Sequence, residues 1–238
     1  MARLAYVTTT EAVVAFLART NFRLLKFVDI GGSQAFVAGA GDGSSVFVAF
    51  RGTGASDPTD LGFDVDAELS PCPQGGRAHR GFMRALELVW STIEPAIPEN
   101  TRLLMTGHSL GAAVATLAAT RRRDAQLFTF GSPRVGDEQF VTRAVANIRH
   151  ERYVDCADIV TRVPPEELGY RHAGTRHYID RHGKEHVSIP DADIRADRLD
   201  AEADYLKRFA FRRGTAATRS LADHAPINYV SGVAGLRD

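Results

Sequence analysis

The sequence is poor in cysteine, in excess charge of either sign and in long apolar runs, and each shortage narrows the class of protein. Its 238 residues include only two cysteines, Cys72 and Cys156, which could pair but are too few for a disulfide framework. Basic and acidic residues number 29 each, so the formal net charge is zero and no nucleic-acid partner is expected. No apolar run is long enough to cross a bilayer, so we expect no transmembrane segment.

The start of the chain also lacks a recognisable export signal. Residues 1–6 contain no basic region followed by an apolar core, and Glu11 and Arg19 interrupt the apolar residues of the next segment. Two free thiols suit a reducing compartment. The sequence therefore predicts a cytoplasmic protein, with secretion by a leaderless route left open.

Beyond these shortages the composition is that of a soluble globular chain. Hydrophobic residues make up 44% and charged residues 24%, both ordinary values. We find no internal repeat, low-complexity tract or linker, and α/β folds of this length often form one domain. A single domain over residues 1–238 is expected.

Two patterns of secondary structure follow each other along the chain. Glycine-rich turns separate short apolar strands near the N-terminus, which predicts an antiparallel meander. Strands and helices then alternate from residue 103 to 155, which predicts a parallel sheet with crossover helices. The expected fold is therefore α/β, with a mostly parallel central sheet, an antiparallel N-terminal meander and helices on both faces. The predicted strands are 24–30, 35–37, 45–50, 103–106, 125–130 and 151–155, and the predicted helices are 10–19, 82–93, 112–119, 136–148 and 196–211.

One stretch in this pattern carries a chemical signature. The apolar strand ends at the G-x-S-x-G sequence of residues 107–111, and an alanine-rich helix starts at once. Strand, sharp turn and helix is the context of a nucleophile elbow, the turn that carries the serine of α/β-hydrolases. The turn requires glycine at 107 and 111 because the backbone passes so closely there. The N-terminal end of the new helix directs N–H groups and positive dipole toward the Ser109 hydroxyl.

A serine nucleophile needs a base, and the base needs a carboxylate partner. In α/β-hydrolases these partners follow in the order serine, acid, histidine. Asp158 fits the acid because it comes directly after a predicted strand, whereas Asp155 is the local alternative inside that strand. Among the histidines after these aspartates, His224 is favoured by its late position ahead of Pro226, which can start a helix. The other histidines are His79, His108 and His150, which come too early in the chain, and His172, His177, His182 and His186, which lie in one short section.

The reaction intermediate also needs hydrogen-bond donors aimed at its oxyanion. One expected donor is the N–H of Leu110, the residue after the nucleophile. The other is Thr53, which closely follows the strand at 45–50 and could offer both its N–H and its hydroxyl. This chemistry uses water and no metal or organic cofactor.

A rival motif occurs at residues 182–186. His182, Glu185 and His186 match H-x-x-E-H, a zinc-binding pattern that requires both histidines on one face of a helix. Here the flanking residues alternate like strands around Gly183, which predicts a β-hairpin instead. We therefore expect no metal site.

Taken together, these segments resemble those of the class 3 lipases, which include the secreted fungal triacylglycerol lipases. The resemblance runs from about residue 46 to 230, most of the chain. It implies an α/β-hydrolase fold, the triad Ser109, Asp158 and His224, an oxyanion hole of Thr53 and Leu110, and a structural His172. The matching segments are 48–53, 79–82, 107–111, 130–137, 158–165, 169–174, and Asp223 and His224 with Tyr229.

The resemblance implies a serine carboxylic-ester hydrolase of lipase type, whose substrates are lipid or other small esters. Transient contact with a lipid surface is compatible with this function. The segment at 55–66 takes the place of the family's apolar lid helix, yet it holds four aspartates and a proline, so shorter or more polar esters are equally plausible. An esterase or phospholipase, and a catalytically silent binding protein of the same fold, are the alternatives.

Overall fold

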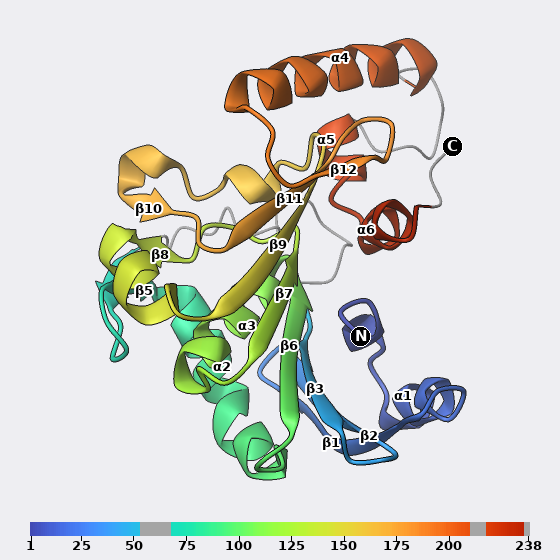
Figure 1. The fold of residues 1–238 in the computed structure, drawn as a ribbon, viewed down its shortest axis with the longest axis vertical. Helices are drawn as coiled ribbons and strands as arrows, with labels where there is room; N and C mark the ends of the chain where they lie inside the picture. The colour runs from blue at the N-terminus through green and yellow to red at the C-terminus, as the bar shows by residue number, and fades with distance from the viewer. Residues whose placement is uncertain (53–67, 210–217, 236–238) are drawn as a thin grey trace.

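A twisted β-sheet runs through the centre of the molecule (Figure 1). The computed structural model describes residues 1–52, 68–209 and 218–235, and in these residues the central sheet has eight strands in the order β1-β2-β3-β6-β7-β9-β11-β12. The first three strands pair antiparallel, β3 to β11 pair parallel, and β12 returns antiparallel. The predicted fold class is therefore confirmed. The strands are β1 (Phe22–Ile30), β2 (Ser33–Ala40), β3 (Ser45–Phe50), β6 (Arg102–His108), β7 (Gln126–Phe130), β9 (Arg149–Asp155), β11 (Thr175–Ile179) and β12 (Glu185–His186).

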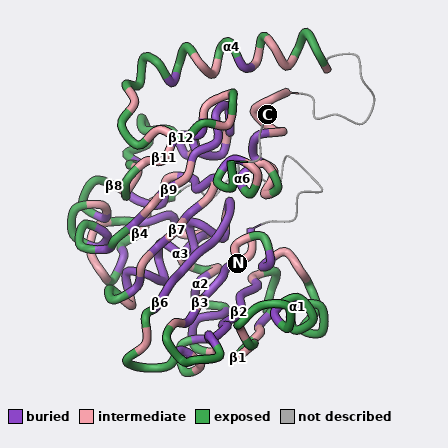
Figure 2. Tube along the Cα trace, turned by 45° about the vertical axis from the view of Figure 1, so that its right-hand side comes forward, coloured by how far each residue is buried: buried purple, intermediate pink, exposed green. Residues whose placement is uncertain are grey.

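Buried apolar side chains point to both faces of this sheet in alternation. Val37 and Val48 join the larger apolar core on the side of α2 and α3, whereas Phe36, Ala38 and Ala49 point to the opposite side and pack with α1 and the N-terminus. Successive residues of a strand face opposite ways, so helices on both faces are needed to cover them. Figure 2 shows the result as a sheet that is buried along most of its length. The helices of this part are η1 (Leu4–Tyr6), α1 (Thr10–Leu17), α2 (Arg80–Ile93), η3 (Glu94–Ala96) and α3 (Leu110–Arg121).

A second, small antiparallel sheet includes the first residues of the helix that was predicted over 136–148. Its order is β10-β8-β5-β4, and Gly136 of β8 pairs with both Ala78 and Arg171. The helix predicted over 136–148 therefore starts late, because its first residues belong to a strand, and it forms one short π-helical segment, η4 (Phe140–Val145). The Asp137 carboxylate supports this change by accepting the N–H of Phe140 at 2.8 Å. The strands are β4 (Leu69–Pro71), β5 (Arg77–His79), β8 (Gly136–Asp137) and β10 (Tyr170–Arg171).

The C-terminal part of the chain crosses the end of the sheet. The long helix α4 lies across the top of Figure 1, and α5 and α6 lie beneath it. Helix α4 starts five residues earlier than predicted, and Asp191 and Asp193 in its first turn are favourable beside the positive end of the helix dipole. No helix among the described residues is both long and apolar enough to cross a membrane. The remaining helices are η5 (Val160–Arg162), η6 (Glu166–Leu168), α4 (Asp191–Phe209), α5 (Arg219–Ala222) and α6 (Pro226–Val233).

A histidine bridges three strands at this end of the sheet. His177 of β11 contacts Glu151 of β9 at 2.8 Å and Glu185 of β12 at 2.6 Å. Partial burial disfavours the charged ring, but hydrogen bonds and attraction from the two carboxylates outweigh it and raise the pKa of His177. The protonated ring therefore ties the edge strand β12 to the parallel part of the sheet.

Candidate active site

The serine of the G-x-S-x-G motif lies at the tip of a strained turn. Ser109 joins β6 to α3 with φ 58° and ψ −131°, a conformation that costs a non-glycine residue about 1–3 kcal/mol. Its own N–H donates to the Phe130 carbonyl at 3.0 Å, which anchors the turn. A Cβ atom at Gly107 would lie 2.1 Å from the Gly111 carbonyl oxygen, and one at Gly111 would lie 2.3 Å from the Phe50 carbonyl oxygen. The two glycines of the motif are therefore required by packing.

The structure brings together three of the side chains that the sequence singled out. Ser109 Oγ lies 2.9 Å from His224 Nε2, and His224 Nδ1 lies 3.0 Å from both carboxylate oxygens of Asp158. All three residues are buried, with 2%, 5% and 0% of Ser109, His224 and Asp158 exposed. Asp158 follows β9 and His224 lies between α5 and α6, so the arrangement joins segments 115 residues apart.

Further donors keep the Asp158 carboxylate ionised. Tyr229 donates its hydroxyl to Oδ2 at 2.5 Å, and the N–H of Val160 donates to Oδ1 at 2.8 Å. Burial alone would raise the pKa of Asp158. The electrostatic attraction of His224 and the hydrogen bonds from His224 and Tyr229 outweigh this effect, so the pKa lies below its ordinary value.

A second histidine, His108, holds the backbone of His224 in place. The carbonyl of His224 can only accept a hydrogen bond, so His108 Nε2, at 2.8 Å, is the protonated nitrogen. Nδ1 then accepts the Tyr6 hydroxyl at 2.6 Å. Burial is the main reason that the pKa of His108 falls to about 3, so the ring stays neutral and both contacts persist at ordinary pH.

Two more contacts fix the loop that carries Asp158. The backbone N–H of Asp155 donates to the Tyr229 hydroxyl at 3.0 Å, so the aspartate that competed with Asp158 in the sequence supports the site through its backbone. Gly131 has φ 58°, and a Cβ atom there would lie 2.8 Å from Asp158 Oδ2 and 3.2 Å from His224. Sequence reasoning did not find these supporting roles. A glycine directly after a strand was one available signal, because it marks a close approach of backbone.

The expected oxyanion donors are described only in part. Leu110 is the first residue of α3, so its N–H has no acceptor within the helix and is free to bind an anion. Thr53 lies outside the described residues, as does the segment at 55–66. Its neighbour Gly52 is described and buried, and a Cβ atom there would lie 3.1 Å from Ser109 Cβ. The end of the described part of this loop is therefore packed against the serine.

The H-x-x-E-H segment forms the predicted hairpin. Strands β11 and β12 pair antiparallel, with Glu185 opposite Ile179. His186 contacts Asp180 at 2.8 Å, whereas His182 accepts a hydrogen bond from Arg181 at 3.0 Å. The two histidines thus have separate partners. In the described part of the chain, no group of three or more His, Cys, Asp or Glu side chains is arranged to hold a metal ion.

The fold and the elbow define an α/β-hydrolase with a serine, histidine and aspartate in hydrogen-bond contact. A sequence model of the lipase (class 3) family matches residues 47–168, and the chain belongs to this family. It is 32% identical over 160 residues to the "Secreted mono- and diacylglycerol lipase 1" of Fusarium solani, an alignment that covers 63% of this chain and 48% of that protein. The chain thus spans about half the length of the relatives it matches.

Solved structures agree with this assignment. The fold is similar to that of lipase II from Rhizopus niveus, with a TM-score of 0.61 and 25% identity over 71% of this chain and 69% of that one. It is also similar to a triacylglycerol lipase whose catalytic centre is described as a serine protease triad. That match has a TM-score of 0.60 and 26% identity over 71% of this chain and 70% of the other.

The predicted cytoplasmic location is wrong. Relatives in the family are named as secreted lipases, which contradicts it. The structure shows why the cysteines misled the prediction. Cys72 and Cys156 are unpaired, but both are buried, and burial raises the pKa of each thiol. Buried thiols of this kind are unreactive and need no reducing compartment.

Proposed function

We propose that the protein is a serine carboxylic-ester hydrolase of the lipase type, in which Ser109, His224 and Asp158 form the catalytic triad. The observation that carries the proposal is the continuous hydrogen-bonded path from Ser109 Oγ through the His224 ring to Asp158. The family assignment supports it, because Ser109 and Asp158 lie within residues 47–168, the part of the chain that matches the family.

Each group has one role in the proposed reaction. Ser109 Oγ attacks the ester carbonyl carbon while His224 Nε2 takes its proton and then passes it to the leaving alcohol. Asp158 holds the ring and stabilises its charged form. The N–H of Leu110 binds the oxyanion, with Thr53 as the second donor that the sequence predicts. Water then attacks the acyl-enzyme by the same route in reverse, so the scheme needs no metal or organic cofactor.

For the substrate we propose an acylglycerol. Among the matched relatives, one is named a mono- and diacylglycerol lipase and another is described as a triacylglycerol lipase. Such substrates gather at lipid surfaces, so the enzyme would make transient contact with an oil–water interface. A secreted location fits this role.

The test is to replace Ser109 with alanine in the purified protein. Hydrolysis of p-nitrophenyl esters and of mono-, di- and triacylglycerols should fall by at least about a thousandfold, because the variant lacks the nucleophile. Covalent labelling by a fluorophosphonate probe should disappear with it. Ser188 is exposed and lies away from the triad in the sequence, so Ser188→Ala is the matched control and should keep both activities.

Unchanged turnover or labelling in Ser109→Ala would contradict the proposal. A parent protein that neither labels nor hydrolyses any of these esters would also contradict it and would favour a silent binding protein of the same fold. The rates of hydrolysis of esters with acyl chains of two to sixteen carbons, each chain about twice as long as the one before, then separate a lipase from an esterase that prefers short esters.

A further inference from the structure

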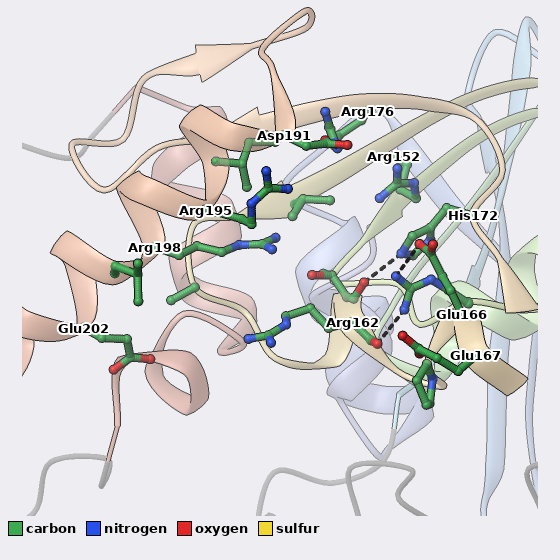
Figure 3. A pocket seen from close by; sticks show the side chains of 17 residues that line it. Arg152, Arg162, Glu166, Glu167, His172, Arg176, Asp191, Arg195, Arg198 and Glu202 are labelled. Atoms are coloured by element: carbon green, nitrogen blue, oxygen red, sulfur yellow. Dashed lines mark hydrogen bonds and ion pairs between the residues drawn. The ribbon is translucent and has the colours of Figure 1, made fainter.

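A large pocket lies apart from the triad, on the far side of the loop that follows β9. Its volume is about 710 Å³, and it is bounded by α4, by β9 and β11, and by the loop carrying Ala157 and Thr161 (Figure 3). Ala157 lines the pocket, while the next residue, Asp158, contacts His224 in the triad. The pocket and the triad therefore share a loop but not a cavity.

The lining of this pocket is rich in arginine. Among the described residues it holds six arginines and four acidic residues. Two arginines are in ion pairs, Arg134 with Glu166 at 2.7 Å and Arg176 with Asp191 at 2.8 Å. The remaining four, which make no ion pair with a described residue, are Arg152, Arg162, Arg195 and Arg198.

The other acidic residues do not balance these four charges. The Glu202 carboxylate accepts the backbone N–H groups of Arg219 and Ser220 at 3.1 and 2.8 Å, so it caps the start of α5. Glu167 is exposed to solvent. Among the described residues, the six arginines of the lining outnumber its four carboxylates, so this part of the pocket keeps an excess of positive charge.

Arg152 is the arginine of the pocket whose positive charge is most costly, because it is buried. Only 7% of Arg152 is exposed to solvent. In the described part of the chain its side chain makes one hydrogen bond, from Nε to the Ala173 carbonyl at 3.1 Å. Burial and the nearby Arg176 and Arg134 lower its pKa only to about 10, so the guanidinium is charged at neutral pH. A buried charge without a counter-ion is strongly unfavourable, and an anion in the pocket would relieve that cost.

We propose that this pocket binds an anionic ligand through a phosphate group, held by Arg152 together with Arg162, Arg195 and Arg198. Figure 3 shows Arg195 and Arg198 projecting from α4 toward the interior, with Arg152 on the opposite wall. The planar guanidinium fork matches two oxygens of a phosphate, and several forks suit a tetrahedral anion better than a single carboxylate. The volume leaves room for the rest of a phosphorylated molecule.

The same chemistry could come from a soluble phosphate ester or from the head group of an anionic phospholipid. The experiment distinguishes them by isothermal titration at constant ionic strength. Inorganic phosphate and glycerol 3-phosphate represent the soluble source, and vesicles of phosphatidylcholine with or without phosphatidate represent the lipid. We expect saturable binding with one site per chain for the phosphates, for the phosphatidate vesicles, or for both.

The variant that tests the site is the double substitution Arg162→Gln with Arg195→Gln. Both residues are exposed, and neither side chain contacts a described residue by a hydrogen bond or ion pair, so the fold should tolerate their loss. Binding should weaken by at least about tenfold, because two charge-assisted contacts are removed. Arg208 is an exposed arginine further along α4 that does not line the pocket, and Arg208→Gln should leave binding unchanged.

The outcomes separate clearly. Saturable binding that weakens in the double variant but not in Arg208→Gln supports the site, and the ligand that binds identifies its source. The proposal is overturned if neither the soluble phosphates nor the phosphatidate vesicles bind, or if binding is equally strong in the double variant. A circular dichroism spectrum and melting temperature equal to those of the parent show that the double variant is folded.

Discussion

The hydroxyl of Tyr229 offers a sharp test of how the site is supported. It accepts the buried N–H of Asp155 at 3.0 Å and donates to Asp158 Oδ2 at 2.5 Å. Tyr229→Phe removes this oxygen while keeping the ring. A hydrogen bond to a charged group contributes about 1.5–3 kcal/mol, and a buried donor left unpaired costs about 1–3 kcal/mol. We therefore expect the free energy of unfolding to fall by about 3 kcal/mol, a decrease of about 6–12 °C in melting temperature for a chain of this size.

Catalysis should respond in a way that simple destabilisation does not predict. With one donor fewer, the ionised form of Asp158 is less stabilised, so the pKa of its carboxyl group rises. The acidic limb of the kcat/KM profile should therefore move to higher pH, with kcat reduced about tenfold and KM little changed.

The assays are thermal unfolding and ester hydrolysis over a range of pH, with a second tyrosine as control. The ring of Tyr153 stacks on the ring of Phe130, with the ring centroids 5.0 Å apart. The Tyr153 hydroxyl makes no hydrogen bond to a described residue. Tyr153→Phe should accordingly leave both measurements close to those of the parent. If Tyr229→Phe melts at the parent's temperature and keeps its pH profile, the reasoning from this hydroxyl is refuted.

Two further predictions concern Gly131 and His177. Gly131→Ala should lower kcat at least about tenfold, because the new Cβ would lie 2.8 Å from Asp158 Oδ2. Gly43→Ala is its control, because Gly43 also has a positive φ but has nothing within 4 Å of the added atom. A similar loss of kcat in Gly43→Ala would show that backbone strain, and not the contact with Asp158, causes the effect. The pKa of His177 is raised in the folded state. The stabilisation that its charged ring gives to the folded protein is therefore fully present below about pH 6.5 and is lost as pH rises through the raised pKa. His177→Gln should therefore lower the melting temperature more at pH 6 than at pH 9, whereas the exposed His182→Gln should not, and a pH-independent loss would rule out the charged bridge.

The parts of the site that the sequence predicted are those with a local signature. The elbow is visible because its glycines must occur two residues on either side of Ser109, where the backbone passes within contact distance. Asp158 and His224 were indicated by chain order and by the resemblance to a family. The meander and the parallel strands followed from turn residues and apolar runs, which depend on nearest neighbours in the sequence.

The parts that sequence reasoning missed depend on contacts between distant residues. Tyr6 reaches His108 across 102 residues, and Tyr229 reaches Asp158 across 71. Tyrosine and histidine occur both in protein cores and at protein surfaces, so their presence in a sequence indicates no partner. The late start of the helix predicted at 136–148 has a similar cause, since pairing with β5 and β10 outweighs the local helical pattern of Gly136 and its neighbours.

These distant contacts explain how a histidine on a C-terminal loop can be positioned without a strand to hold it. The carbonyl of His224 is bound by His108, which adjoins Ser109 in sequence. The preceding residue, Asp223, accepts the backbone N–H of Ala157, which adjoins Asp158, at 3.1 Å. The segment that carries His224 is therefore tied, by its backbone and by the Asp223 side chain, to the neighbours of Ser109 and Asp158. Any movement of the loop that would separate His224 from Ser109 must first break a buried hydrogen bond, and this requirement keeps the three groups in register.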